Sequence, residues 1–338
     1  MAGLIAVRST QFGGGGCLHA RYSVSVLARK IGLMSPAEGI SLSISGTTRL
    51  YGIMGHPVTH SLSPVMHTFA FRQHNLNCVY LPFPVPPAQL AQAVAGALAL
   101  GVGGFNVTIP HKEAIVAYVD EVSATARAIG AVNTVHVRDG RTIGYNTDGE
   151  GFLQPLRALH LPLTEIVTCL LGAGGAARAV AMALLAAGCP VLMLANRTQA
   201  RAERLVAMLQ ESFPGAEVRA VPLAEAARVA RQSGLLVNAT SVGLHDAGGA
   251  LLPDTCFRPG QVVYDLVYRP LYTPLLHAAR RGGATVIPGL DMLIGQGAAA
   301  FQIWTGLPFP VEAVRRLLQP FFATASSASQ REQRAEGP

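Results

Sequence analysis

The sequence predicts an α/β protein built from two domains. With 338 residues, the chain is long enough for two domains of ordinary size. Half of the residues are hydrophobic and only 13% are charged, so a large core can be buried. From residue 49 onward, short apolar strands alternate with helical segments, and this alternation is typical of mostly parallel sheets covered on both faces.

The first module, residues 49–150, alternates strands with helices and ends in a hairpin. Ser63 stands immediately before Pro64, so we expect Ser63 to be the N-cap of the first helix. Asp139-Gly140 is a turn signal between two extended runs and predicts the hairpin. The predicted strands are 49–55, 78–85 and 103–109, the predicted helices are 63–76, 89–100, 113–118 and 124–129, and the hairpin covers 131–148.

The second module, residues 151–289, continues the alternation as a Rossmann-like βαβ series. Two further helical segments, 290–305 and 311–319, are long enough to cross back onto the first module, so we expect residues 290–320 to complete that domain. The predicted strands are 165–171, 190–197, 217–222, 234–240, 261–268 and 284–289, and the predicted helices are 172–188, 201–210, 223–232 and 273–281.

The two ends of the chain differ in composition from these modules. Residues 1–48 contain the run Gly13–Gly16, four basic residues before Met34 and no acidic residue before Glu38. A transit peptide is basic and acid-poor in this way, but we favour an upstream extension with translation starting at Met34. We expect residues 1–48 and the polar tail 323–338 to be disordered.

Composition and charge argue against several classes of function. The net charge is +7, but the arginines are scattered rather than clustered with aromatics, which disfavours nucleic-acid binding and is compatible with anionic small molecules. The five cysteines form no CxxC pair, so neither a zinc site nor a disulfide frame is indicated, and a reducing cytoplasm is the expected location. The longest apolar run, residues 179–195, is broken by Gly188 and Pro190, so no membrane span is expected.

A glycine-rich loop follows the first strand of the second module and opens a helix. Its sequence is Gly172-Ala173-Gly174-Gly175-Ala176-Ala177. Glycines at such a junction let the backbone turn tightly and approach a pyrophosphate, whose charge is favoured by the helix N-terminus. The motif alone could be a structural turn, but the flanking strand, the helix and the next strand favour a dinucleotide site.

The end of the next strand bears on which dinucleotide binds. Asn196-Arg197-Thr198 stands where an NAD enzyme usually has an acidic residue for the ribose 2′-hydroxyl. Arg197 and Thr198, with Arg201 one turn later, would instead attract and hydrogen-bond a 2′-phosphate. NADP is therefore the expected cofactor, and the alternative is that Arg197 and Arg201 are ordinary surface cations.

Two serines precede the first helix in the loop 55–64. Ser61 and Ser63 could grip a polyhydroxy or carboxylate ligand, or they could only cap the helix, which the spacing alone favours. Pro57 and the Ser-Pro break keep the nearby histidines off one helical face, so no metal site is expected. These histidines are His56, His60 and His67.

Nine motifs together resemble the shikimate dehydrogenase family. They are GHPVTHSLSP (55–64), GGFNVTIPHK (103–112), GAVNT (130–134), YNTDG (145–149), GAGGAA (172–177), NRT (196–198), NATS (238–241), DLVYRP (265–270) and GLDMLIGQGAAAFQIWTG (289–306). They follow the order of the family over nearly the whole region predicted to fold. The resemblance implies NADP-dependent interconversion of 3-dehydroshikimate and shikimate, a step of aromatic amino-acid biosynthesis. It also implies an N-terminal, mostly parallel α/β substrate domain and a Rossmann-like NADP-binding domain, with a cleft between them.

The resemblance further implies roles for individual residues. Ser61 and Ser63 match residues that bind the substrate carboxylate, and Lys112 with Asp148 matches the catalytic pair. Further substrate contacts are implied for Thr108, Asn133, Tyr268 and Gln296. Cofactor contacts are implied for the loop residues Gly172, Ala173, Gly174, Gly175 and Ala176, for the 2′-phosphate clamp Asn196, Arg197, Thr198 and Arg201, and for Thr240, Gly289 and Met292.

The chemistry of ketone reduction agrees with the role implied for Lys112. The strand before it has apolar residues on one side, namely Phe105, Val107 and Ile109. Thr108 is then free to face the cleft, and Pro110 ends the strand so that Lys112 lies near its carboxyl end. Reducing a ring ketone needs a hydride on one face and a proton for the carbonyl oxygen, which an ammonium group can deliver. A carboxylate such as Asp148 would keep the lysine protonated and oriented, whereas partial burial would act in the opposite direction.

Two alternatives stay open at the level of sequence. A quinate/shikimate dehydrogenase of the same superfamily accepts an extra ring hydroxyl and often prefers NAD. Arg197 and Thr198 disfavour NAD, but the serine motif does not exclude quinate. A non-catalytic NADP-binding sensor would be favoured by loss of Lys112 or Asp148, and both are present. We expect a monomer or a homodimer without a nucleic-acid or membrane partner.

Overall fold

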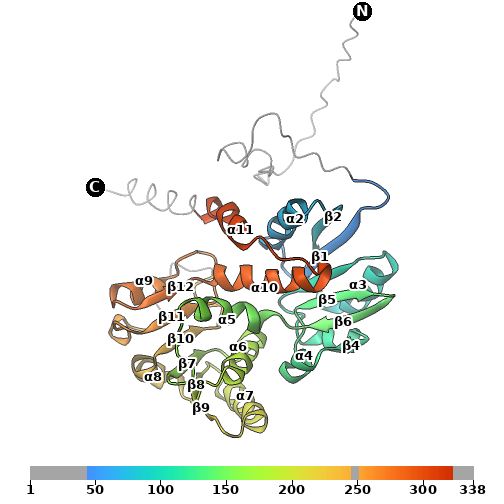
Figure 1. The fold of residues 1–338 in the computed structure, drawn as a ribbon. Helices are drawn as coiled ribbons and strands as arrows, with labels where there is room; N and C mark the ends of the chain where they lie inside the picture. Colours follow the sequence, from blue (N-terminus) through green and yellow to red (C-terminus); the bar gives the residue numbers. More distant parts are fainter. Residues whose placement is uncertain (1–43, 245–250, 323–338) are drawn as a thin grey trace, which may run out of the picture. The chain divides into compact units, whose positions relative to one another are not determined.

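The computed structural model describes residues 44–244 and 251–322 (Figure 1). Over this part of the chain, two six-stranded sheets are each accompanied by helices, which confirms the α/β fold class. The predictions made for residues 1–43 and 323–338 lie outside the described residues. The predicted disorder of residues 1–48 is wrong for residues 44–48, because they form a turn whose Thr48 hydroxyl donates to Asn77 Oδ1 at 2.8 Å. Within the described ranges, none of the helices is both long and apolar enough to cross a membrane.

The first sheet has the strand order β2-β1-β3-β5-β6-β4. Its strands are β1 (Arg49–Gly55), β2 (Cys78–Pro84), β3 (Gly104–Val107), β4 (Glu121–Val122), β5 (Thr134–Arg138) and β6 (Arg141–Tyr145). β1 pairs in parallel with β2 and β3, whereas β5 runs antiparallel to both β3 and β6. Asp139 and Gly140 have φ angles of 52° and 75°, which confirms the turn predicted for the β5–β6 hairpin.

The helices that accompany this sheet begin close to where the sequence predicts. They are α2 (Ser63–Gln73), α3 (Leu90–Ala99) and α4 (Ala124–Ile129), with the 3₁₀ turns η1 (Pro87–Gln89) and η2 (Ala114–Tyr118). The prediction that Ser63 is the N-cap of α2 is wrong, because Leu62 occupies that position and Ser63 is already helical. The Ser63 N–H donates to the Ser61 hydroxyl at 3.2 Å. Since Pro64 has no N–H to satisfy in the first turn, the helix can start one residue earlier.

The second sheet is entirely parallel and has the order β12-β11-β10-β7-β8-β9. Its strands are β7 (Val167–Leu171), β8 (Val191–Ala195), β9 (Glu217–Val221), β10 (Leu235–Asn238), β11 (Val262–Asp265) and β12 (Thr285–Ile287). The connecting helices are α6 (Gly175–Ala186), α7 (Gln199–Ser212), α8 (Ala226–Gln232) and α9 (Pro274–Arg281), with the short turns η3 (Leu223–Glu225) and η4 (Asp254–Cys256). The order reverses between β7 and β10, and Rossmann folds bind dinucleotides at the carboxyl ends of the strands at such a reversal.

Helix α5 (Asp148–Ala158) has no counterpart among the sequence predictions. Its glycines and Pro155 are typical of a loop, although its apolar residues share one buried face. A Cβ at Gly151 would lie 2.4 Å from the Gln296 backbone nitrogen in α10 (Gly289–Thr305), so the two helix backbones approach closely. Packing on α10 therefore explains a helix that the local sequence pattern does not indicate.

Helices α5 and α10 connect the two sheets (Figure 1). The Trp304 indole of α10 donates to the Val135 carbonyl in the first sheet at 3.0 Å. Phe152 of α5 stacks on Tyr264 in the second sheet, with ring centroids 5.0 Å apart. Helix α11 (Val311–Leu318) then packs on α2, so the last helices of the described chain lie against the first sheet.

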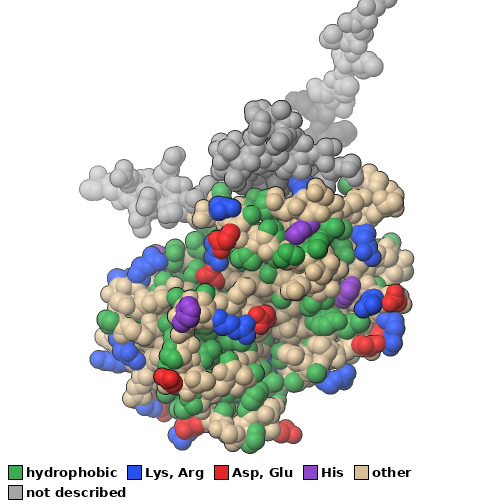
Figure 2. Space-filling model, in the orientation of Figure 1, with side chains coloured by type: hydrophobic (Ala, Val, Ile, Leu, Met, Phe, Trp, Pro, Cys, Tyr) green, Lys and Arg blue, Asp and Glu red, His purple; other side chains and the backbone are tan. Residues whose placement is uncertain are grey.

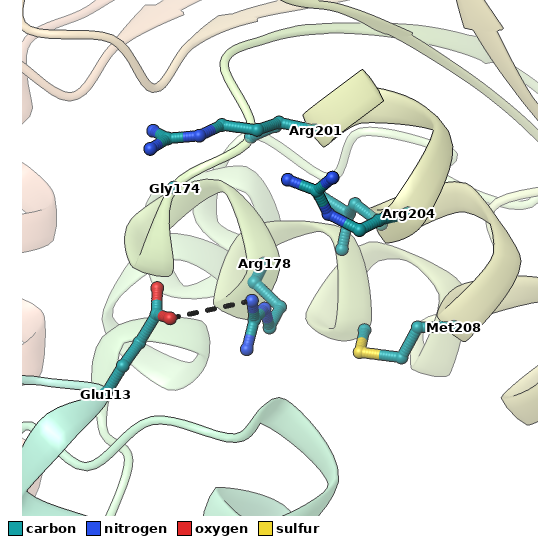
Figure 3. A pocket seen from close by; sticks show the side chains of 8 residues that line it. Glu113, Gly174, Arg178, Arg201, Arg204 and Met208 are labelled. Atoms are coloured by element: carbon teal, nitrogen blue, oxygen red, sulfur yellow. Dashed lines mark ion pairs between the residues drawn. The ribbon is translucent and has the colours of Figure 1, made fainter. Parts of the chain in front are cut away.

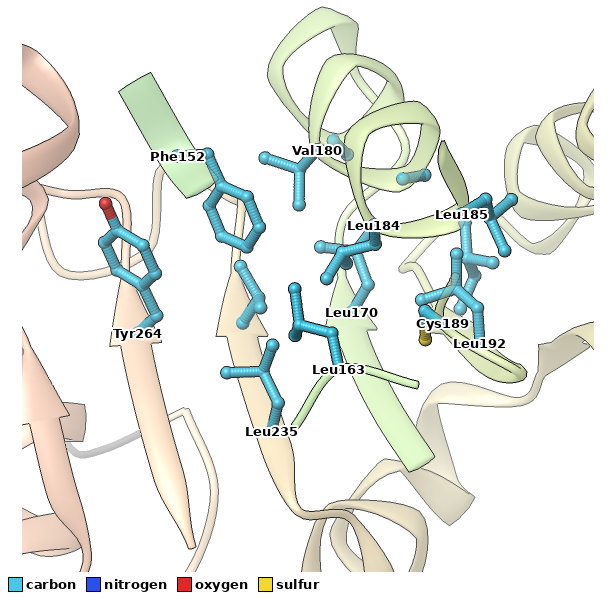
Figure 4. Close-up of a cluster of buried hydrophobic side chains, with 14 of the residues drawn as sticks. Phe152, Leu163, Leu170, Val180, Leu184, Leu185, Cys189, Leu192, Leu235 and Tyr264 are labelled. Atoms are coloured by element: carbon cyan, nitrogen blue, oxygen red, sulfur yellow. The ribbon is translucent and has the colours of Figure 1, made fainter. Parts of the chain in front are cut away.

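A large apolar cluster lies between the second sheet and helices α5 and α6 (Figure 4). Leu170 and Leu235 project from neighbouring strands toward Val180 and Leu184 of α6, and Phe152 packs beside them. All five side chains are fully buried, and each such side chain contributes about 1.5–3 kcal/mol to folding. This packing fixes β7 against α6 and therefore holds the ends of the glycine-rich loop that joins them.

A buried histidine lies among aromatic side chains between α2, β2 and α10. His67 is 0% exposed, and neither of its ring nitrogens has a hydrogen-bond partner among the described residues. Its ring stacks on Tyr80 with centroids 4.6 Å apart and lies 5.2 Å from the Trp304 ring. Burial lowers the pKa of His67 to about 3.

This burial predicts that acid weakens the fold. In the unfolded chain His67 binds a proton below its ordinary pKa of 6.5, whereas in the folded chain it stays neutral down to about pH 3. Its contribution to the free energy of unfolding therefore falls as the pH drops through 6.5, by about 2 kcal/mol between pH 7.5 and pH 5. Denaturant unfolding of the wild type and of His67→Phe over this range measures the effect. Between pH 7.5 and pH 5, the free energy of unfolding should fall by about 2 kcal/mol more in the wild type than in His67→Phe. Equal falls in the two proteins would contradict this prediction.

Candidate active site

The motif GGFNVTIPHK forms strand β3 and the turn after it. The strand ends at Val107 rather than at Ile109 as predicted. Ile109, predicted to be on the apolar side of the strand, lies beyond the last paired residue and is 69% exposed. The turn is closed by the His111 N–H, which donates to the Thr108 carbonyl at 2.9 Å, and the buried His111 ring bonds a backbone carbonyl at 2.7 Å. Lys112 therefore follows a well-anchored turn.

Lys112 and Asp148 form a hydrogen-bonded ion pair with 2.5 Å between Nζ and Oδ2. The side chain of Asp148 is only 4% exposed and that of Lys112 is 19% exposed. Asp148 is the first residue of α5, where the helix N-terminus favours a negative charge. The Lys112 backbone is also fixed, because its carbonyl accepts the Val132 N–H at 2.7 Å. The structure thus brings together two side chains that lie 36 residues apart in the sequence.

Asn133 is the second partner of Asp148. Its amide nitrogen donates to Asp148 Oδ1 at 2.8 Å and to Thr147 Oγ1 at 3.0 Å. The Thr134 hydroxyl donates to Asn133 Oδ1 at 3.0 Å, and the Asn106 amide donates to Thr134 Oγ1 at the same distance. Each of these residues, counted with its backbone, is at most 3% exposed. Because a buried polar group without a partner costs about 1–3 kcal/mol, the network restricts where Asp148 can lie.

Tyr80 extends this network toward the serine loop. Its hydroxyl donates to Asn106 Oδ1 at 2.7 Å. Burial raises the pKa of Tyr80 well above its usual value, and a hydrogen bond with Ser63 partly offsets that rise. Ser63 is 3% exposed, whereas Ser61 is only partly buried. Ser61 is therefore the more accessible of the two serines.

Within the described ranges, three further predicted substrate residues make no direct bond to the ion pair. Thr108, Tyr268 and Gln296 are partly buried, and none of them is hydrogen-bonded to Lys112 or Asp148 in the described part of the chain. The Gln296 amide donates to a carbonyl of its own helix at 2.9 Å. Burial raises the pKa of Tyr268, and the charge of the neighbouring arginine acts in the opposite direction.

The glycine-rich loop leaves open space in front of α6. Gly172 has a φ of 114°, and a Cβ there would lie 2.9 Å from the Ala239 carbonyl oxygen, so glycine is required. Helix α6 starts at Gly175 with Gly174 as its N-cap and no side chain capping its N–H groups. A Cβ at Gly174 would meet nothing within 4 Å, and one at Gly175 would meet only the Glu113 carboxylate, at 3.9 Å. The helix N-terminus can therefore receive a phosphate.

A cavity of about 490 Å³ lies beside this loop (Figure 3). Its walls are formed by Ala173 and Gly174 of the loop, Arg178 of α6, Glu113 at the start of η2, and Arg201, Arg204, Leu205 and Met208 of α7. Three arginines face one glutamate, so the cavity favours an anionic occupant. Arg178 and Arg204 were not predicted from the sequence. The usable signal was their spacing, because each stands three residues after a predicted position and shares its helical face.

The Asn-Arg-Thr segment forms the turn between β8 and α7. The Asn196 amide donates to the Thr198 carbonyl at 2.9 Å, and Thr198 occupies the N-cap position of α7. Arg197 is exposed at this turn. Of the four residues predicted to hold a 2′-phosphate, only Arg201 lines the cavity.

The loops after β10 and β11 are tied together at Asp265. The Asn238 amide donates to Asp265 Oδ1 at 2.9 Å, and the Thr240 hydroxyl donates to Asn238 Oδ1 at 2.7 Å. The Thr273 hydroxyl donates to Asp265 Oδ2 at 2.5 Å. Burial raises the pKa of Asp265 to about 6, and its hydrogen bonds act against that rise. Thr240 is held near the glycine-rich loop, since its Cγ2 lies 3.3 Å from the Cβ position of Gly172.

Two predicted cofactor residues lie in the first turn of α10. A Cβ at Gly289 would lie 2.4 Å from the Leu266 carbonyl oxygen, so α10 starts in close contact with the loop after β11. Met292 is 7% exposed and belongs to the apolar cluster under the second sheet. Their place beside a nicotinamide stays a prediction.

The fold and the loops at the strand ends define the class as a two-domain α/β enzyme with a Rossmann-like dinucleotide site. Family models narrow this class. The model described as "Shikimate dehydrogenase substrate binding domain" matches residues 53–135. The models "Shikimate / quinate 5-dehydrogenase" and "Shikimate 5'-dehydrogenase C-terminal domain" match residues 158–245 and 289–319.

Relatives with known names agree with the family models. A protein named Shikimate dehydrogenase (NADP(+)) from Moorella thermoacetica is 48% identical over 287 residues, which cover 84% of this chain and 97% of the relative. A protein of the same name from Methanopyrus kandleri is 47% identical over 281 residues, covering 82% of this chain and 97% of the relative. The chain therefore belongs to the shikimate dehydrogenase family.

Solved structures show the same fold. A shikimate dehydrogenase in complex with NADP+ has a TM-score of 0.80 at 40% identity, covering 84% of this chain and 99% of that one. The Thermus thermophilus enzyme in complex with NADP(H) and shikimate has a TM-score of 0.72 at 44% identity, covering 80% and 100%. A quinate dehydrogenase from Corynebacterium glutamicum in complex with NAD has a TM-score of 0.75 at 32% identity, covering 80% and 98%.

Proposed function

We propose that this chain catalyses the reversible, NADP-dependent reduction of 3-dehydroshikimate to shikimate, a step of the pathway to the aromatic amino acids. The observation that carries the proposal is the shielded contact between Lys112 and Asp148, 2.5 Å long, beside an open dinucleotide loop. Identity of 48% over 287 residues to a protein named Shikimate dehydrogenase (NADP(+)) supports the choice of substrate and cofactor.

The ion pair donates the proton in the reduction and accepts it in the reverse reaction. When bound, NADPH supplies the hydride. Lys112 Nζ donates a proton to the ring carbonyl oxygen and stabilises the negative charge that develops there. Asp148 orients the ammonium group through a charge-assisted hydrogen bond. In the reverse direction the pair accepts the proton from the substrate hydroxyl, so both residues act as one acid–base unit.

The composition of the chain supports a proton-transfer role for Lys112. Lys and Arg together number 26, and only two of them, Lys30 and Lys112, are lysines. A chain that uses arginine almost everywhere else has a lysine at this position. An amine can alternate between its charged and neutral forms, whereas a guanidinium stays protonated and cannot serve as the acid.

The substrate is assigned to the polar residues around the ion pair. We place its carboxylate at Ser61, in the loop before α2, and at Ser63, the first residue of α2. Asn133 acts on Asp148 directly, because its amide nitrogen donates to Asp148 and Thr147. The other residues proposed to surround the ring are Thr108, Tyr268 and Gln296.

The cofactor is assigned to the Rossmann-like half. We place the NADP pyrophosphate at the N-terminus of α6, where the loop leaves open space, and the 2′-phosphate near Arg201 in the positively charged cavity. We propose residues 151–289 as the cofactor domain and residues 49–150, completed by 290–320, as the substrate domain. The remaining cofactor contacts are proposed for Gly172, Ala173, Gly174, Gly175, Ala176, Asn196, Arg197, Thr198, Thr240, Gly289 and Met292.

The proposed partners are small anionic molecules. Over the face shown in Figure 2, basic side chains are interspersed with acidic, uncharged and hydrophobic surface, so the positive walls of the cavity are a local feature. We further propose that the enzyme works in the cytoplasm as a monomer or a homodimer.

A four-way steady-state assay tests substrate and cofactor together. We expect shikimate with NADP+ to give a kcat/KM at least about tenfold above shikimate with NAD+ or quinate with either cofactor, because Arg201 and Arg204 in the cavity favour the 2′-phosphate. A higher kcat/KM for quinate with NAD+ would favour the quinate dehydrogenase alternative. Binding of NADP+ without turnover of either substrate would favour the sensor.

Substitution of Lys112 tests the acid–base assignment. Lys112→Met removes the ammonium and keeps the length of the side chain, so kcat should fall by about 10²–10⁴-fold. Lys112→Arg is the matched control, because it restores the positive charge without a transferable proton and should stay similarly slow. The KM for NADP+ should change little in both variants. Near-normal kcat in Lys112→Met would contradict the assignment. A near-normal kcat in Lys112→Arg alone would show that Lys112 acts only through its positive charge.

A further inference from the structure

Arg178 links the cofactor loop to the half of the molecule that carries the ion pair. It lies in the first turns of α6, lines the cavity and points toward Glu113 (Figure 3). The two side chains are 3.8 Å apart between Nη2 and Oε2. Glu113 immediately follows Lys112, so the guanidinium reaches from the Rossmann-like half to the neighbour of the proposed acid.

A second contact of Arg178 reaches the end of α4. Its Nη1 donates to the Ile129 carbonyl at 3.1 Å. Ile129 is the last residue of α4, and carbonyl groups at a helix C-terminus favour a cation. Gly130 makes room for this contact, because a Cβ there would lie 2.9 Å from Nη1. The φ of Gly130 is 69°, which glycine also adopts readily.

The two contacts of the guanidinium lie on the two segments that present the catalytic machinery. Glu113 is next to Lys112, and Ile129 begins the segment that leads to Asn133, the partner of Asp148. The segments are joined to each other because the Val132 N–H donates to the Lys112 carbonyl at 2.7 Å. A shift of the guanidinium would therefore displace Lys112 together with Asn133, whose amide donates to the Asp148 carboxylate.

Stability alone does not account for this arrangement. The Glu113 side chain is 57% exposed and that of Arg178 is 27% exposed, and ion pairs of that kind contribute little to folding. Geometry matters far more for catalysis, since a misplacement of about 1 Å at a reacting group can cost about a hundredfold in rate.

We propose that Arg178 is a positioning residue that holds the Lys112 segment against the cofactor loop and so sets the place of the proton donor relative to the hydride-transfer site. The inference rests on the proposed function. It assigns Arg178 to the turnover step, whereas a cavity arginine that only bound the cofactor would affect NADP+ affinity.

Kinetics of three variants separate these roles. Arg178→Met keeps the side-chain stem and should lower kcat for shikimate oxidation at least about tenfold, with the KM for NADP+ within about threefold of the wild type. Arg204→Met is the matched control, because it removes the same charge from the α7 wall of the cavity; its effect should fall on the KM for NADP+. Arg178→Lys has no fork to span both acceptors, so its kcat should be intermediate.

A second readout does not depend on turnover. Lys30 and Lys112 are the only lysines in the sequence, so acylation of Lys112 by an amine-reactive reagent can be followed by mass spectrometry against Lys30. Arg178→Met should raise the acylation rate of Lys112 at least about threefold, because the Lys112 amine would separate from Asp148 more often. Arg204→Met should leave that rate unchanged.

The outcomes decide the proposal in each case. Lower kcat together with faster acylation of Lys112 supports it. Unchanged kcat and acylation would overturn it, as would a rise in the KM for NADP+ alone. If Arg178→Met does not fold, the comparison of Arg178→Lys with the wild type decides by the same two readouts. If the wild type does not oxidise shikimate with NADP+, the proposed function fails, and the acylation rates still decide whether Arg178 positions Lys112.

Discussion

The contact between Lys112 and Asp148 is the interaction around which both halves of the molecule are arranged. A carboxylate that is only 4% exposed needs partners for both oxygens, because a buried charge left unpaired is strongly destabilising. Lys112 Nζ donates to Oδ2 and the Asn133 amide donates to Oδ1. The N-terminus of α5 adds a favourable electrostatic potential. The pair therefore depends on three local structures at once: the end of β3, the start of β5 and the first turn of α5.

The position of α5 depends in turn on packing far from the ion pair. Gly151 lets the α5 backbone come against α10, and α10 is tied to the first sheet through Trp304. Phe152, one residue further along α5, stacks on Tyr264 in the second sheet. Asp148 is thus placed by contacts with both sheets, whereas Lys112 belongs to the first. The buried core between the second sheet and α6 holds the ends of the glycine-rich loop on the same framework.

The family was recognised from nine motifs in a fixed order. Local signals in the sequence were sufficient for every strand except β4, which was not predicted, and for the glycine-rich loop, because alternating periodicity and loop glycines need no partner to be recognised. They failed where tertiary contacts decide. Helix α5 looks like a loop until α10 packs on it, and Ile109 continues the strand pattern although pairing has stopped at Val107. The buried network was not predicted either. Asn106 resembles any polar residue in a strand, and only the β3–β5 register places it opposite Thr134.

A crystal structure with NADP+ and shikimate bound would test most directly whether the ion pair is the acid–base unit. If Lys112 is the acid, the oxygen of the reacting shikimate hydroxyl should lie about 3 Å from Lys112 Nζ, within hydrogen-bonding reach. Asp148 should still contact both Lys112 and Asn133. An oxygen more than about 5 Å from Nζ, too far even for transfer through one water, would contradict the central claim.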